Sequence, residues 1–93
     1  MKMIDVTNSH YNLVSNQLEN TDAFNVKVYS LGSSTVIYTE ANTHKNLIVL
    51  NRSRTVRDQE VNFAISKLLE QDNRHKLEVL KGHNFVQIEK IIR

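Results

Sequence analysis

The chain has 93 residues, of which 40% are hydrophobic and 24% charged, and 12 basic against 10 acidic side chains give it a net charge of +2. This is the composition of an average globular domain, so we expect one folded domain over residues 1–93, and the charge balance does not favour a nucleic-acid partner. The sequence has no cysteine, which excludes a disulfide framework and thiolate chemistry and favours a reducing, cytoplasmic setting, while no apolar run approaches the roughly 18 residues of a membrane span.

The first half of the chain predicts a strand, a helix and then a hairpin. Residues 1–6 read as a short strand, without the long apolar run that a signal peptide needs. The cap residues and apolar spacing of residues 7–20 predict an amphipathic helix. Residues 26–31 and 35–39 alternate as strands do, and residues 32–34 between them predict a tight reversal.

The second half predicts a buried strand, a second helix and a final strand. Residues 47–50 are apolar on both faces, as in the middle of a sheet. Thr55 is expected to open the helix, with Asp58 completing its cap. The apolar stripe of this helix consists of Val61, Ala64, Ile65, Leu68 and Leu69. Residues 85–92 favour a strand, although the spacing of their apolar residues also suits a helix, and residues 77–80 fit either a brief helix or a short strand.

The order of the predicted elements is therefore β-α-β-β-β-α-β. It indicates an α+β fold built on a small mixed sheet, with a right-handed crossover between the first two strands and two helices on one face. A sheet covered on one side only leaves its second face for a partner or for another copy of the chain.

The most suggestive polar segment lies between the buried strand and the second helix. Its candidate anion ligands are Arg52, Arg54, Thr55 and Arg57. Guanidinium groups at a helix start suit a phosphate, a carboxylate or a nucleic-acid backbone. The alternative is a solvated turn whose arginines pair with Asp58 and Glu60, since no glycine-rich phosphate loop is present.

A second candidate is an apolar surface on the hairpin, formed by Tyr29, Leu31, Ile37 and Tyr38. Depending on the register, the two tyrosines form a cross-strand pair or lie on opposite faces. If these residues lie on the face away from the helices, they offer a surface for a protein partner or a homo-oligomer.

No constellation in the sequence specifies a catalytic or metal site. The histidines are His10, His44, His75 and His83. Their spacing matches no metal motif, so we predict no metal and no cofactor. No serine lies in a nucleophile motif. A small enzyme built around His44 and Lys45 is left as a third possibility, although we expect no enzymatic activity.

The segments MKMIDVTNSH, QLENTDA and VKVYSLG are similar to a family of short, uncharacterised proteins from streptococci, enterococci and related lactic-acid bacteria. The similarity extends from the first strand into the second helix. The family is described as a domain of unknown function, so the resemblance implies a bacterial, cytoplasmic protein and supplies no site residues. The leading hypothesis is a non-enzymatic interaction or regulatory module that uses the uncovered sheet face, and anion or nucleic-acid binding is the alternative.

Overall fold

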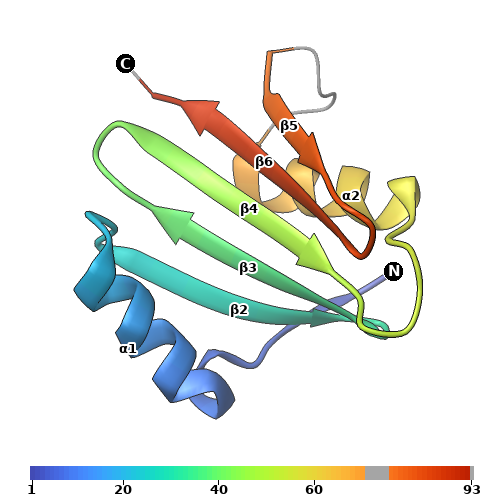
Figure 1. Ribbon diagram of the computed structural model, residues 1–93, viewed down its shortest axis with the longest axis horizontal. Helices are drawn as coiled ribbons and strands as arrows, with labels where there is room; N and C mark the ends of the chain where they lie inside the picture. The colour runs from blue at the N-terminus through green and yellow to red at the C-terminus, as the bar shows by residue number, and fades with distance from the viewer. Residues whose placement is uncertain (71–75, 93) are drawn as a thin grey trace.

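The computed structural model describes residues 1–70 and 76–92. Six strands form one sheet in the order β1-β2-β3-β4-β6-β5 (Figure 1). The strands are β1 (Met3–Asp5), β2 (Asn25–Leu31), β3 (Ser34–Glu40), β4 (His44–Leu50), β5 (Glu78–Lys81) and β6 (Phe85–Ile91). The helices are α1 (Tyr11–Asn20), which follows a 3-10 turn over Thr7–His10, and α2 (Asp58–Ala64), which continues as a π-helical turn over Ile65–Leu69. The predicted α+β class is confirmed.

The sheet is antiparallel and not mixed, because every strand pairing among the described residues is antiparallel. The predicted crossover between the first two strands is therefore wrong: Met3 of β1 lies opposite Leu31 of β2. The N–H of Val6 bonds to the carbonyl oxygen of Val28 at 2.9 Å, and α1 then packs on β2. Strand β1 thus pairs with β2, and helix α1, which follows it in the chain, packs on the same strand.

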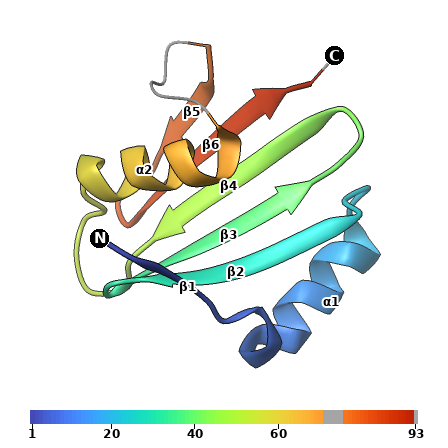
Figure 2. The same cartoon turned by 180° about the vertical axis from the view of Figure 1, so that it is seen from behind.

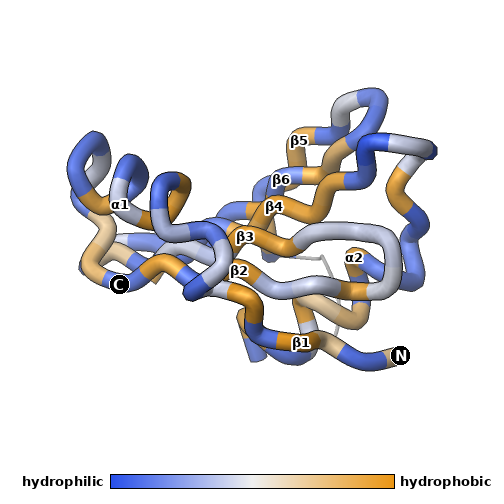
Figure 3. The backbone as a smooth tube through the Cα atoms, turned by 90° about the horizontal axis from the view of Figure 1, so that it is seen from below, coloured by the Kyte–Doolittle hydropathy of each residue, from blue (hydrophilic) through white to orange (hydrophobic). Residues whose placement is uncertain are grey.

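The two helices lie on opposite faces of the sheet, which corrects the prediction that they share one face (Figure 3). Strand β2 explains the difference, because it buries side chains on both of its faces. Val26 and Val28 are buried on the face that carries α1, whereas Leu31 is buried in the cluster beneath α2. The alternation of residues 26–31 in the sequence predicts a strand that buries only one of its faces.

The main core lies between α2 and the centre of the sheet (Figure 2). Two cross-strand rows form its sheet side, and they are Val36–Val49–Val86 and Tyr38–Leu47–Ile88. The predicted helical stripe packs on these rows, since Val61, Ala64, Ile65 and Leu69 are buried and Leu68 is partly buried. Burial of each such aliphatic side chain contributes roughly 1.5–3 kcal/mol, so α2 is the better anchored helix.

The hairpin and the C-terminal strands complete the sheet. Gly32 has a φ of 58° in the turn that joins β2 to β3, a conformation that glycine adopts without steric cost. The open alternative for residues 77–80 resolves as strand β5, and the predicted strand β6 is confirmed. Lys90 of β6 donates a hydrogen bond to the carbonyl oxygen of Leu69 at 2.8 Å and so ties the sheet to the end of the π-helical turn. No helix in the described parts of the chain is long and apolar enough to cross a bilayer.

Candidate functional site

The side of the sheet opposite α2 is covered by α1 only over β2, which leaves β3, β4 and β6 without a helix above them (Figure 3). We call this surface the open face. It consists of Thr35, Ile37, Thr39, Asn46, Ile48, Leu50, Phe85, Gln87 and Glu89. All of these side chains are partly exposed. The predicted uncovered face therefore exists, but it is one half of the side that carries α1.

The centre of the open face is apolar. Ile37 and Ile48 are directly opposite each other in the β3–β4 pairing, and Leu50 lies two positions further along β4. Directly paired side chains contact each other and stabilise a sheet even where no second layer covers them. Residues 47–50, predicted to be apolar on both faces, place Leu47 and Val49 in the core and leave Ile48 and Leu50 on the open face.

Helix α1 forms one wall of this surface and is weakly anchored. None of its residues is buried, and the apolar side chains of Tyr11 and Leu18 are 74% and 42% exposed. A helix of this length is marginal in water without tertiary packing. In the isolated chain, α1 therefore depends on a limited contact with β2 for its stability.

Two hollows lie between α1 and the open face, and they share Ile37. The first, of about 260 Å³, is lined by Gln17 of α1 and by Asn46. The second, of about 360 Å³, is lined by Leu13 of α1 and by Arg52. Both lie along β3 on either side of Ile37, and we call the two hollows together the α1 groove.

The amide oxygen of Asn46 is a buried acceptor beside the first hollow of this groove. Asn46 Oδ1 is buried and accepts no hydrogen bond from any residue that the structure describes. An unsatisfied buried acceptor costs roughly 1–3 kcal/mol.

The two ends of the open face carry opposite charge. At one end, Glu78 and Glu89 lie directly opposite each other in the β5–β6 pairing. Like charges in such a pair repel, and neither carboxylate forms an ion pair within residues 1–70 and 76–92. At the other end, Arg52 and His10 line the second hollow. The surface is therefore acidic towards the outer edge of β5 and basic towards the β4–α2 loop.

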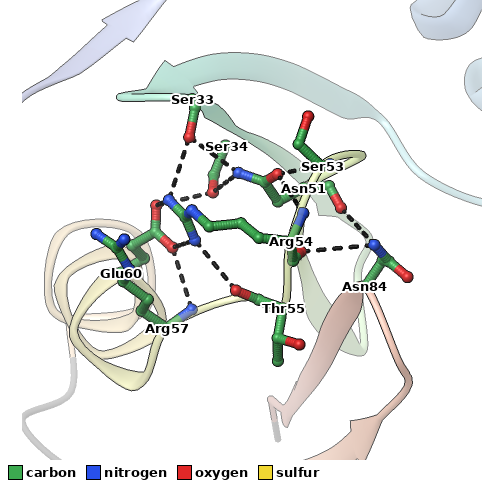
Figure 4. Close-up of polar contacts among 9 residues, drawn as sticks. All are labelled: Ser33, Ser34, Asn51, Ser53, Arg54, Thr55, Arg57, Glu60 and Asn84. Atoms are coloured by element: carbon green, nitrogen blue, oxygen red, sulfur yellow. Dashed lines mark hydrogen bonds and ion pairs between the residues drawn. The ribbon is translucent and has the colours of Figure 1, made fainter.

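The predicted anion site is organised around an internal carboxylate (Figure 4). Glu60 is 5% exposed, and the guanidinium of Arg54 donates to both of its oxygens at 2.9 and 3.1 Å. Ser34 Oγ also donates to Glu60, at 2.7 Å, and so does the backbone N–H of Arg57, at 3.1 Å. The start of α2 is thus already paired with an anion from the chain itself.

These contacts explain the local electrostatics and the helix start. The hydrogen bonds from Arg54, supported by those from Ser34 and the Arg57 N–H, lower the pKa of Glu60 from 4.5 to about 2 against the effect of burial. Its hydrogen bonds to Glu60 raise the pKa of the Arg54 guanidinium in turn. Helix α2 begins at Asp58 and not at the predicted Thr55. The reason is that Arg57 is the capping residue, and the carboxylate of Glu60, three positions on, accepts the hydrogen bond from its backbone N–H.

The three arginines consequently point to different surroundings and do not form one basic surface. Arg54 is held by Glu60 and also donates to the carbonyl oxygen of Thr55 at 3.1 Å, so both residues hold the loop together. Arg57 is exposed at the start of α2. Arg52 alone lines the α1 groove, on the other side of the sheet. The alternative interpretation, a turn paired with an acidic side chain, therefore describes Arg54 correctly.

The predicted hairpin surface is wrong for three of its four residues. Leu31 is fully buried, Tyr38 is 7% exposed, and Tyr29 packs partly buried against the same cluster beneath α2. The register explains this, because Tyr29 pairs with Val36, a residue of the α2 core. Only Ile37 lies on the open face, where Ile48 and Leu50 accompany it in place of the tyrosines.

The residues proposed for a small enzyme do not converge. His44 and Lys45 are successive residues of β4, so their side chains point to opposite faces. Lys45 Nζ lies 3.9 Å from Glu40 Oε2, whereas His44 lines the α1 groove. Among the described residues no group of side chains is arranged to hold a metal. His75 lies outside the described residues.

Comparisons with known proteins identify a family for this chain. The family described as domain of unknown function, DUF1827, matches residues 1–90. The chain belongs to this family. A crystal structure described as a conserved protein of unknown function from Streptococcus thermophilus LMG 18311 is 34% identical to this DUF1827 chain. It covers 98% of this chain and 96% of its own length, with a TM-score of 0.89. No curated protein matches the chain.

These matches confirm the resemblance inferred from the sequence, including its streptococcal setting. Neither description names an activity for this family of DUF1827 chains.

Proposed function

We propose that this DUF1827 chain is a non-enzymatic, cytoplasmic interaction module that associates with a second copy of itself through the open face. The observation that carries the proposal is the Ile37–Ile48 pair, which is partly exposed at the centre of a sheet half that has no helix above it. Burial of such apolar surface is the main driving force of association. The small core of a 93-residue chain makes an additional layer on this face favourable.

Charge complementarity favours a second copy as the occupant. A two-fold axis that lies in the plane of the interface, diagonal to the strands, would place the basic end of one copy, with Arg52, over the acidic end of the other, with Glu78 and Glu89. Isologous interfaces are self-complementary in this way. The pairing would also relieve the repulsion between the two carboxylates, and opposite charges direct the register of an interface more than they add affinity.

Analytical ultracentrifugation tests the proposal. The wild-type chain is expected to sediment as a dimer at micromolar concentrations, and Ile48→Glu is expected to sediment as a monomer with an unchanged circular dichroism spectrum, because it places a charge at the apolar centre. Val79→Glu is the matched control. Val79 is 41% exposed and pairs with Ile88 of the α2 core, so it lies on the other side of the sheet. A wild-type chain that remains monomeric at about 100 µM would rule the proposal out, since an interface that weak has little physiological use.

A further inference from the structure

We infer that the second hollow of the α1 groove is a binding site for a small organic anion, a carboxylate or phosphate group carried on an apolar body, with Arg52 and Ser33 as its polar ligands. This site goes beyond the proposed self-association and does not depend on it. It also differs from the anion site expected from the sequence, because it lies on the open face and excludes Arg54 and Arg57.

Arg52 is the cation of the site. It is exposed and lines the hollow. Unlike Arg54, it pairs with no carboxylate of the described residues. No aspartate or glutamate is among the residues that line this hollow, whereas the first hollow of the groove includes Asp22. A guanidinium with free donors and no neighbouring anion is the arrangement that binds carboxylate or phosphate in two-pronged fashion.

Ser33 supplies a directed hydroxyl donor. Its Oγ accepts hydrogen bonds from Asn51 Nδ2 at 3.0 Å and from the Arg54 guanidinium at 3.1 Å (Figure 4). Both acceptor positions of the hydroxyl are therefore used, which leaves its hydrogen to be donated. Since Ser33 also lines the hollow, that donor is available to an acceptor bound there. The hydrogen bond from the positively charged Arg54 polarises the hydroxyl and strengthens it as a donor.

The loop that carries Arg52 is held in place by Asn51. Asn51 is 2% exposed, and its Oδ1 accepts the backbone N–H groups of Ser53 and Arg54 at 2.9 and 3.1 Å. The carbonyl oxygen of Asn51 accepts a hydrogen bond from Asn84 Nδ2 at 3.0 Å. Arg52 therefore projects from a fixed backbone, which reduces the conformational entropy lost when it binds a ligand.

His10 and the hydroxyls of the hollow extend the polar side of the site. His10 Nδ1 lies 3.1 Å from the carbonyl oxygen of Val6. A carbonyl oxygen can only accept, so Nδ1 carries the hydrogen and Nε2 is the ring nitrogen left for other contacts. Thr35 and Ser53 line the same hollow and offer rotatable hydroxyl donors.

The remaining lining residues require an apolar body on the ligand. Leu13, Ile37 and Leu50 contribute aliphatic side chains to the hollow, whose volume is about 360 Å³. Ligand pockets for small organic molecules start at roughly 300 Å³ and combine an apolar lining with a few polar groups. A bare inorganic anion would leave the aliphatic residues without a contact, so an anion with a ring or a short chain is the better fit.

An NMR titration of the uniformly labelled chain with phenyl phosphate tests the inference, with benzoate and inorganic phosphate as parallel probes. We expect saturable shifts at the amides of Ser33, Leu50 and Arg52, with inorganic phosphate the weakest of the three probes. Arg52→Gln should weaken phenyl phosphate binding about tenfold or more, as expected for the loss of a charged hydrogen-bond donor. Arg57→Gln is the control, because it makes the same charge change at an exposed arginine outside the hollow.

The same titration on a neutral variant at the centre of the open face, Ile48→Asn, separates this inference from self-association, because it removes apolar surface without adding an anion beside the site. Binding that persists on that chain and is lost with Arg52→Gln supports the site whatever the oligomeric state of the wild type. No saturable shift with any probe up to about 10 mM, where even weak sites fill, overturns it. Equal losses for Arg52→Gln and Arg57→Gln also overturn it, because they would show attraction to net charge only.

Discussion

The guanidinium of Arg54 contacts both carboxylate oxygens of Glu60, with NH1 2.9 Å from Oε1 and NH2 3.1 Å from Oε2. This pair joins the loop after β4 to the start of α2. Through Ser34, which donates to Glu60 at 2.7 Å, the pair also fixes the hairpin between β2 and β3. The loop after β4 and the β2–β3 hairpin, which border the open face, are thus both held by the Glu60 carboxylate on the other side of the sheet.

Glu60→Gln is expected to destabilise the chain by about 1–3 kcal/mol at neutral pH, because Arg54 loses its charged acceptor and Gln can accept through one oxygen only. Chemical denaturation measures the change in the free energy of unfolding. Glu19→Gln is the matched control, since Glu19 is exposed on α1 and its substitution should change stability by less than about 0.5 kcal/mol. Equal effects of the two substitutions would contradict a structural role of the pair.

The stability of the wild type is expected to fall in acid because of this carboxylate. The pKa of Glu60 lies at about 2 in the folded chain against an ordinary value of 4.5. A lowered pKa stabilises the fold fully above about pH 4.5, and this contribution is lost as the pH falls towards 2. The difference in unfolding free energy between the wild type and Glu60→Gln should therefore shrink over that range, and a constant difference would assign the destabilisation to shape and not to charge.

Tyr38 predicts a matching loss of stability in alkali. Its burial, with a smaller contribution from Glu40, raises the pKa of its phenol to about 12. A phenol that stays protonated in the folded chain while it ionises near 10 when unfolded destabilises the fold between about pH 10 and 12. Tyr38→Phe should unfold at a higher pH midpoint than the wild type, measured by circular dichroism. Tyr11→Phe, at a tyrosine that is 74% exposed, should leave the midpoint unchanged.

The elements of the fold were predictable from local patterns, but their partners were not. The alternation of β2 and β3, the apolar run of residues 47–50 and the stripe on α2 each identify an element correctly. The direction of β1 is set by its antiparallel pairing with β2, in which Met3 lies opposite Leu31, and no local pattern specifies that pairing. The face chosen by α1 depends on Val26 and Val28, which are buried by that helix and not by the main core.

The candidate site shows the same division. A cluster of arginines can be recognised in the sequence, but which of them is neutralised depends on Glu60, since only the fold brings its carboxylate to Arg54. Ser33 was missed because its hydroxyl becomes a free donor only when Asn51 and Arg54 occupy its acceptor positions. A signal for the open face was present in Ile48 and Leu50, whose apolar character on the second face of a central strand requires either a covering layer or a partner.

Binding of an organic anion and self-association are expected to oppose each other. In the proposed dimer Arg52 faces the acidic end of the partner, so a phosphate or carboxylate bound to the same guanidinium would compete with that contact. Such coupling is reciprocal: because the dimer holds two equivalent anion sites, the factor by which saturating phenyl phosphate raises the dimer dissociation constant must equal the product of the factors by which dimerisation weakens phenyl phosphate binding at the two sites. Sedimentation at increasing phenyl phosphate concentration measures the first factor, and titration of the wild type against the neutral variant Ile48→Asn measures the per-site factor. Arg52→Gln should abolish the dependence of the dimer on the ligand. A dimer that is unaffected by saturating phenyl phosphate would place Arg52 outside the interface while leaving the anion site intact.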